Sequence, residues 1–361
     1  MHKLHVVGTQ VGRMRPDIEH LVFAVGALPL ILAAMSYFVP VLTRSGKTPR
    51  LLAGIPLAAV IAGTGIVGFF VHGTPALRFA APWIALVAVA LFAFWLALRW
   101  HRCLGHANPC IAWYAAALGL LALGLIAVAV APYWPERAHA LRVFHIHINT
   151  LGFIGVTALG TMQVLLPTIA GQIDTGATER LTRDLKWSAG GAFILALGVT
   201  LAPPLAVIGA VAYAWPPLRL IGHVWRNWRT GILSAGSTLP LLVAGLTGLC
   251  FVLVQGGLHT FDITTGAAAI PLFIIAFLLP LVSGAAGHLL PVWLLPGIRN
   301  AWHTESRRRL AYGARARGVL LLTGGVMAAL GLAGGYALGV FGALWLVGSM
   351  MLAVAFKRPA R

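Results

Sequence analysis

The segment CIAWYAAALGLLALGLIAVAVA, residues 110–131, contains no charged side chain over 22 residues. A helix needs about 20 consecutive apolar residues to cross the hydrocarbon core of a bilayer, so this segment is long enough to span one. Runs of similar length recur between residues 20 and 356. These runs do not alternate polar with apolar residues, and an open sheet would leave its backbone groups unpaired in lipid. The sequence therefore predicts an all-α, polytopic transmembrane protein.

The composition agrees with this class. Hydrophobic residues make up 59% of the chain and charged residues 9%, whereas soluble domains carry about 25% charged residues. The net charge of +18 would suggest nucleic-acid binding in a soluble protein. Here the basic residues occupy short loops between apolar runs, so we expect the lipid bilayer, and no nucleic acid, as the partner. Three cysteines do not form a disulfide framework.

Eleven spans account for the apolar runs, and the loops between them indicate an orientation. Alternate loops and the C-terminal tail hold 20 of the 26 lysines and arginines, which places these loops in the cytoplasm by the positive-inside rule. The N-terminus is then outside and the C-terminus inside, as an odd number of spans requires. The predicted spans are roughly 20–43, 51–72, 80–99, 110–131, 145–169, 187–202, 204–225, 232–255, 261–284, 314–333 and 335–356.

Three segments of the chain resemble one another: 20–40, 145–167 and 259–280. Each begins with a histidine, reaches a glycine six or seven residues later, places a proline fourteen or fifteen residues after that glycine, and precedes a basic loop. This pattern predicts a pseudo-threefold repeat of four-helix units, with the last helix of the third unit missing. The predicted repeats cover about 20–132, 133–256 and 257–361. They form one transmembrane domain, 20–361, behind an extracytoplasmic N-terminal segment, 1–19.

Histidines mark the start of each repeat, and they are the best candidates for a functional site. His20, His145, His147 and His259 are expected at the outer ends of the first, fifth and ninth helices, where packing of the repeats around an axis would bring them together. His72, at the end of the second span, is a weaker candidate for a metal ligand in the same layer. Ionisable groups at membrane depth are functional candidates, and imidazole is a common ligand of metals and heme iron.

The pair His145 and His147 constrains how such a site is built. Residues two apart on a helix diverge by roughly 200°, so the two rings face different sides and would serve different sites. A pair from two helices, such as His20 with His147 or His259 with His145, would hold a heme through both axial positions. Alternatively, histidines at a membrane interface cap helices or bind headgroups and water, and the sequence leaves this open.

The segment HIHINTLGFIGVTALGTMQVLLP, residues 145–167, resembles two families of membrane metalloproteins. It is similar to the HxH helix of the heme-copper oxidase catalytic subunits, particularly the cbb3-type branch. It is also similar to the HxxTxGxIG helix of the NnrS family of heme–copper membrane proteins associated with nitric-oxide stress. The oxidases have twelve helices in three arcs, with ligating histidines on inward-running helices two, six and ten. The resemblance implies that spans one, five and nine match those helices.

This chain also departs from the oxidase pattern. The span aligned with the oxidase copper helix, residues 186–201, has no histidine, and the HxH motif lies on the span aligned with helix six instead of helix ten. A proton-pumping terminal oxidase is therefore disfavoured, and any enzymatic activity would be of the oxidoreductase type. No carboxylate or lysine sits in the middle of a span to relay protons.

The resulting expectation is a bacterial inner-membrane protein that binds heme b, with copper left open. The resemblance implies electron transfer or nitric-oxide handling, with a quinol or cytochrome as electron partner. It also leaves open an association with partner subunits. Two alternatives remain: a cofactor-free transporter, since internal repeats are common there, and an accessory subunit of a larger complex in which the histidines only pack.

Overall fold

The computed structural model describes residues 15–234, 236–297 and 300–355, and every regular element in these ranges is helical. Of the predicted N-terminal segment 1–19, residues 1–14 lie outside this description, and the first helix already begins at Pro16. The elements are α1 (Pro16–His20), η1 (Leu21–Ala27), α2 (Leu28–Leu42), η2 (Leu52–Gly54), α3 (Ile55–His72), α4 (Pro75–His101), α5 (Cys110–Val130), η3 (Ala131–Tyr133), η4 (Pro135–Arg137), α6 (Ala138–His147), η5 (Ile148–Gly155), α7 (Val156–Ala170), α8 (Ala177–Leu201), α9 (Pro203–Leu233), α10 (Leu239–Thr260), η6 (Gly266–Ala268), α11 (Ala269–Pro271), η7 (Leu272–Leu278), α12 (Leu279–Leu294), α13 (Ala301–Leu310), α14 (Ala314–Ala329) and α15 (Ala333–Ala355).

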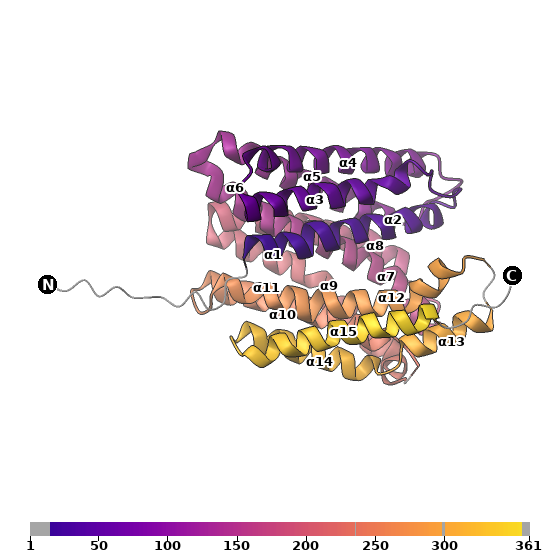
Figure 1. Cartoon of the computed structure of the whole chain (residues 1–361). Helices are drawn as coiled ribbons and strands as arrows, with labels where there is room; N and C mark the ends of the chain where they lie inside the picture. The colour runs from indigo at the N-terminus through magenta and orange to yellow at the C-terminus, as the bar shows by residue number, and fades with distance from the viewer. Residues whose placement is uncertain (1–14, 235, 298–299, 356–361) are drawn as a thin grey trace.

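The helices confirm the polytopic membrane fold (Figure 1). Within the described ranges, nine helices are long and apolar enough to cross a bilayer: Pro16–Leu42, Leu52–His72, Pro75–His101, Cys110–Tyr133, Pro135–Ala170, Pro203–Ile232, Leu239–Thr260, Gly266–Leu294 and Ala333–Ala355. The other two predicted spans correspond to α8 and α14. The first third of α8 is rich in charged residues, and α14 has only 16 residues. Both nonetheless lie in the bundle, against α9 and α15 respectively.

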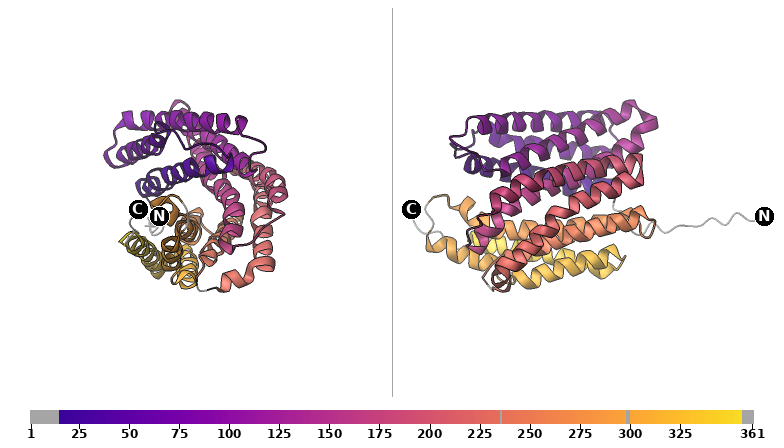
Figure 2. Two further views of the ribbon diagram at one scale, coloured as in Figure 1. Left: turned by 90° about the vertical axis from the view of Figure 1, so that its right-hand side faces the viewer. Right: turned by 180° about the vertical axis from the view of Figure 1, so that it is seen from behind.

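The chain runs around the bundle in the order of its sequence. Viewed along the helices, the N-terminal, middle and C-terminal thirds follow one another around a ring (Figure 2, left). His20, His147 and His259 lie at one end of the bundle, which we call the histidine end. The loops 43–54, 102–109 and 171–176 lie at the opposite end, which we call the basic end.

Three π-helical segments support the threefold repeat. The segments η1, η5 and η7 each lie in the first span of a predicted unit. They begin directly after His20, His147 and Pro271. A proline lies 20 positions after each of these residues, at Pro40, Pro167 and Pro291, so Pro291 takes the place that the sequence pattern gave to Pro280. A π-helical turn is rare and is typical of functional sites, so three of them at matching positions indicate a common structural unit.

This alignment corrects the predicted start of the third unit. His259 does not open the ninth span but lies at the C-terminal end of α10, and the position that matches His20 and His147 is Pro271. The expected eighth and ninth spans, 232–255 and 261–284, are therefore shifted to Leu239–Thr260 and Gly266–Leu294. The physical reason is that α10 continues through Gly256 and Gly257. It ends only before Asp262, a residue type that tolerates the left-handed backbone it adopts here (φ 55°).

Small residues explain how the partly polar helix α8 is held in the bundle. A Cβ atom added to Gly191 would meet the backbone of Tyr213 at 2.6 Å, and Gly198 and Gly209 lie equally close to the backbone of the facing helix. Close approach of two backbones is how membrane helices associate without a hydrophobic driving force. The Nε1 group of Trp113 on α5 also donates a hydrogen bond to the Leu181 carbonyl of α8 (2.9 Å).

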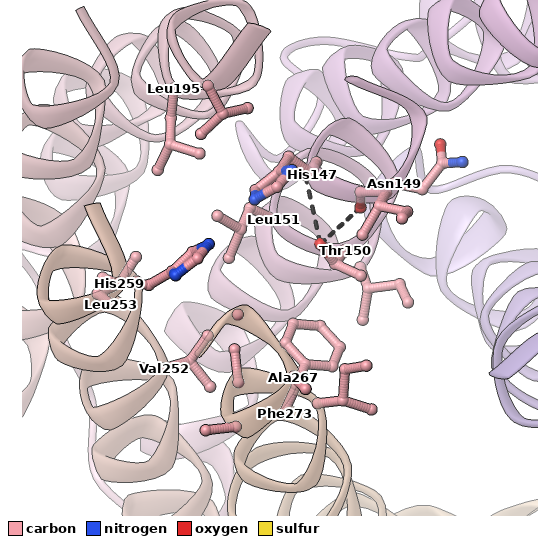
Figure 3. A pocket seen from close by; sticks show the side chains of 18 of the residues that line it. His147, Asn149, Thr150, Leu151, Leu195, Val252, Leu253, His259, Ala267 and Phe273 are labelled. Atoms are coloured by element: carbon pink, nitrogen blue, oxygen red, sulfur yellow. Dashed lines mark hydrogen bonds between the residues drawn. The ribbon is translucent and has the colours of Figure 1, made fainter. Parts of the chain in front are cut away.

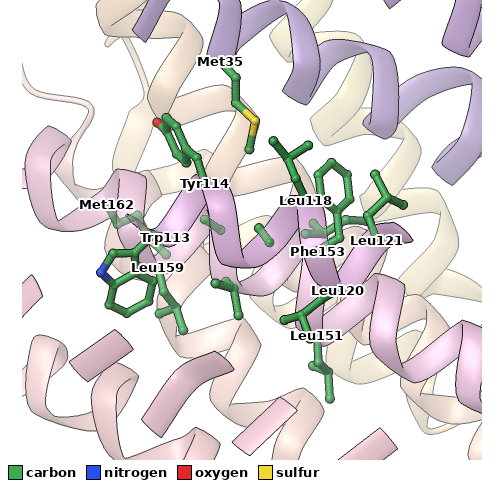
Figure 4. Close-up of a cluster of buried hydrophobic side chains, with 14 of the residues drawn as sticks. Met35, Trp113, Tyr114, Leu118, Leu120, Leu121, Leu151, Phe153, Leu159 and Met162 are labelled. Atoms are coloured by element: carbon green, nitrogen blue, oxygen red, sulfur yellow. The ribbon is translucent and has the colours of Figure 1, made fainter. Parts of the chain in front are cut away.

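The main buried cluster lies where α2, α5, η5 and α7 meet (Figure 4). The side chains of Trp113, Tyr114, Leu118 and Phe153 are almost inaccessible to solvent. Met35 of α2 packs against this group. The segments η5 and α7, which continue the helix of His145 and His147, are therefore anchored in this buried cluster.

Candidate functional site

A large cavity opens at the histidine end of the bundle. Its volume is ≈ 1760 Å³, which exceeds the roughly 300–1,000 Å³ of most small-molecule sites. Its walls come from all three units, including α1, η1, η5, α9, α10 and η7. Most of the lining side chains are apolar, and the two charged ones, Arg15 and Glu19, come from the start of the described chain.

All four histidines predicted to bind a cofactor line this one cavity: His20, His145, His147 and His259. They reach it from the α1–η1 junction, the end of α6 and the end of α10. His72, the weaker candidate, is not among the lining residues. It is the last residue of α3, and its side chain is exposed.

Two of the four histidines face each other. His147 approaches His259 across the cavity, as the two rings in Figure 3 show. His20 and His145 line the same cavity from α1 and α6, and we refer to them as the second pair. The sequence offered His20 with His147 and His259 with His145 as examples of a pair, and the facing rings of His147 and His259 match neither example.

Every one of the four rings is oriented by a backbone carbonyl. The Nδ1 atoms lie 2.7 Å from Pro16 O in His20, 2.9 Å from Gly124 O in His145, 2.9 Å from Val143 O in His147 and 3.1 Å from Thr264 O in His259. A carbonyl oxygen only accepts hydrogen bonds, so Nδ1 must carry the proton. In the neutral ring Nε2 then keeps its lone pair, which is the arrangement of histidines that bind metals.

The two pairs differ in how free this lone pair is. Nε2 of His147 and of His259 has no hydrogen-bond partner among the described residues. In the other pair, the Asn149 amide lies 3.0 Å from Nδ1 and 3.4 Å from Nε2 of His145, and the His20 ring packs on Phe70 with centroids 4.9 Å apart. Of the two pairs, His147 and His259 are better placed to accept a ligand.

Three residues of the site were not identified from the sequence. Gly266 lies beneath the His259 ring, where an added Cβ would be 3.0 Å from Nε2. The Gly124 carbonyl orients His145 from the neighbouring span, and nothing in a single sequence signals this contact. Asn149 lies four residues after His145, so its helical spacing was a usable signal.

The donor set fits a heme better than a free metal ion. In the described part of the chain, no three His, Cys, Asp or Glu side chains gather closely enough to hold one metal. A heme needs only axial ligands from the protein, and two facing imidazoles provide them. Apolar lining residues such as Phe153 and Leu195 suit the faces of a porphyrin.

A separate polar cluster lies at the basic end. The Arg180 guanidinium donates to Asp174 at 2.6 Å and to the Gln163 side chain at 3.2 Å, and His223 Nε2 lies 3.3 Å from the same Asp174 carboxylate. The side chains of Asp174 and Arg180 are only 5% and 7% exposed. This cluster ties the 171–176 loop to α7, α8 and α9, and it is far from the histidine cavity along the bundle.

Comparison with known proteins identifies no relative of this chain. No protein-family model, curated protein or solved structure matches the chain.

Proposed function

We propose that the protein is a membrane heme protein that binds a b-type heme in the cavity at the histidine end, with His147 and His259 as axial ligands. One observation carries the proposal: two histidines from different helices face each other across the cavity. Both hold Nδ1–H to a backbone carbonyl, and both leave Nε2 without a protein partner. His20 and His145 form a second pair, which we assign as a weaker site of the same type.

Electron transfer suits this arrangement better than nitric-oxide handling. A heme held by both His147 and His259 would supply one-electron redox chemistry, and neither histidine would be left free to make room for a gas. The chain's own residues orient the ligands through Val143 O and Thr264 O, and the apolar walls limit the access of water. Copper is not part of the proposal, because the described residues offer no three-ligand group for it.

The likeness to heme-copper oxidases and NnrS proteins in the 145–167 segment supports the same proposal. It suggests a bacterial inner membrane, with the histidine end outside according to the distribution of basic loops. A quinol or a cytochrome would be the electron partner. The unit structure with three matching π-helical segments also agrees with a three-arc relative of this superfamily.

Absorption spectroscopy of the detergent-solubilised protein, expressed with ample heme, tests the proposal. We expect the Soret and alpha bands of a six-coordinate b-type heme. Both bands should be lost in the His147→Ala and His259→Ala variants, because each removes one axial ligand.

His72→Ala is the matched control, since His72 lies at the same end but outside the cavity lining, and its spectrum should equal that of the unmodified protein. A colourless protein would overturn heme binding altogether. Bands that survive both alanine substitutions but disappear in His20→Ala or His145→Ala would move the heme to the other pair.

A further inference from the structure

The cavity continues well below the histidines along one face of α9. Val207, Val211, Ala214 and Leu218 all line it and follow one another at intervals of three or four residues. Leu218 is 15 residues from the first residue of α9, Pro203, which corresponds to roughly 22 Å at a rise of 1.5 Å per residue. Along this helix the cavity extends for a length comparable to most of a hydrocarbon core of roughly 30 Å.

One wall of this lower part is open. Val211 and Leu218 of α9 are 67% and 53% exposed, and Val254 of α10 is 60% exposed, although all three line the cavity. On the other side the lining residues Phe153 and Phe273 are 2% and 4% exposed. The helix α9 runs obliquely across the bundle (Figure 2, right). Because the exposed residues of α9 and α10 also line the cavity, we take the cavity to be open to the surface beside these two helices. In a membrane this opening faces lipid.

The lining changes in polarity along its length. The histidines, Thr150 and Thr265 lie at the histidine end, together with the charged Arg15 and Glu19. The lower part, along Val207 to Leu218 of α9 and Cys250 to Val254 of α10, contains no charged residue. A molecule that matches this profile has a small polar head and a long apolar tail, oriented like the lipids of the same leaflet.

We propose that the opening between α9 and α10 admits a neutral amphiphile from the bilayer, with a polyprenyl or alkyl tail along α9 and an uncharged, hydrogen-bonding head near the histidines. An uncharged head is inferred because most polar side chains of the lining are uncharged and its cation, Arg15, is already paired with Asp17. The inference does not depend on heme, because it rests on the shape, exposure and polarity of the lower cavity.

A spin label at the edge of the opening tests this inference in phosphatidylcholine vesicles. Val254→Cys is labelled with a nitroxide in a Cys103→Ser, Cys250→Ser background, where Cys110 is fully buried and unreactive. Val87→Cys on α4, a residue that is 58% exposed and outside the cavity lining, provides the matched lipid-facing control. Collisions with oxygen report contact with lipid, and collisions with a water-soluble nickel chelate report contact with water.

We expect frequent oxygen collisions and few nickel collisions at both positions. Farnesol, an uncharged alcohol with a prenyl tail, should then reduce the motion and oxygen collisions of the label at residue 254 but not at residue 87. Val211→Trp fills the opening, so it should abolish the effect of farnesol. This variant places a larger apolar side chain on an exposed surface and is not expected to impair folding.

Three outcomes would overturn the inference. Strong nickel collisions at residue 254 would show a water-filled cavity, and equal farnesol effects at residues 254 and 87 would show non-specific partitioning. Spin–spin broadening at residue 254 would show that a second copy of the chain covers the opening. Hexadecane, which has a tail but no head, and farnesyl phosphate, which has a charged head, separate recognition of the head from filling by the tail.

Discussion

A neutral imidazole has one N–H group, and the four histidines of the cavity direct theirs to four different carbonyls. The acceptors lie within the same turn for His20 and His147, in the following loop for His259, and on a neighbouring span for His145. Ring orientation is therefore fixed before any ligand binds, and preorganisation of this kind is what metal-binding histidines require.

The contact between Gly266 and His259 provides the most specific test at the residue scale. In Gly266→Ala the added methyl group would approach Nε2 to 3.0 Å, so the ring must turn and weaken its bond to Thr264 O. We expect weaker heme binding, measured by titration of the apoprotein with heme, with little change in stability. Gly257→Ala is the control, because Gly257 also lines the cavity but has open space around its Cβ position. Equal heme affinities in the two variants would argue against His259 as a ligand.

The buried ion pair at the basic end should make stability depend on pH. Burial alone raises the pKa of Asp174. The hydrogen bond and charge of Arg180, with the charge of His223, outweigh it and lower the pKa below its usual value. The resulting stabilisation is present above the unfolded-state pKa of roughly 3.9 and is lost as the pH falls through the lower folded-state pKa.

We therefore expect Asp174→Asn to cost about 3–5 kcal/mol at pH 7, as removal of one partner from a buried pair does. The difference in unfolding free energy from the unmodified protein should shrink as the medium is acidified below roughly pH 4. Reversible unfolding in mixed micelles measures both. Asp17→Asn removes the carboxylate of an exposed pair with Arg15 and should cost far less. Equal losses at the two positions would show that the Asp174 pair is not buried in solution.

At the scale of the element, the π-helical segment η5 decides where the HxH motif points. A π-helical turn contains one residue more than an α-helical turn, so it rotates His145 and His147 relative to the anchored helix α7. The Tyr213 hydroxyl of α9 donates to the Leu151 carbonyl inside this segment (3.1 Å) and lies directly over Gly155. The segment is thus held by a contact that only glycine at residue 155 permits.

A double-mutant cycle tests this contact. Gly155→Ala places a methyl group against the Tyr213 hydroxyl and should destabilise the protein by about 1–3 kcal/mol, as overpacking of a core does. Tyr213→Phe removes the hydroxyl and one hydrogen bond, at a cost of about 1 kcal/mol. In the double variant, thermal stability in detergent should exceed that of Gly155→Ala alone, because the Phe ring leaves room for the methyl group. Simple additivity of the two losses would contradict the proposed packing.

At the scale of the whole molecule, the two ends differ in charge, and this difference predicts the orientation in the membrane. Single cysteines at Ile173, which is 93% exposed at the basic end, and at the exposed Glu136 of the histidine end report on it. In intact cells, a membrane-impermeant maleimide should label Glu136→Cys but not Ile173→Cys. Inverted vesicles should give the reverse pattern. Labelling of Ile173→Cys in intact cells would invert the proposed topology and place the cavity in the cytoplasmic leaflet.

Much of this architecture follows from local sequence. Eleven apolar runs predict eleven helices, because a bilayer allows few alternatives to an uninterrupted helix. His20, His145, His147 and His259 were identified from their position at span ends, and all four line one cavity. The third unit was misaligned because His259, Gly266 and Pro280 repeat the spacing of the first two units, and a single sequence does not reveal that α10 continues to Thr260.

The sequence by itself determined the membrane class, the course of the spans and the histidines worth considering, since each depends on composition and spacing along the chain. The tertiary structure alone decided that His147 faces His259, that four carbonyls orient the rings, and that residues of all three units line one cavity. These features depend on how distant helices cross and on the rotation that η5 introduces. Neither leaves a periodic signal in the sequence, because both arise from packing between units.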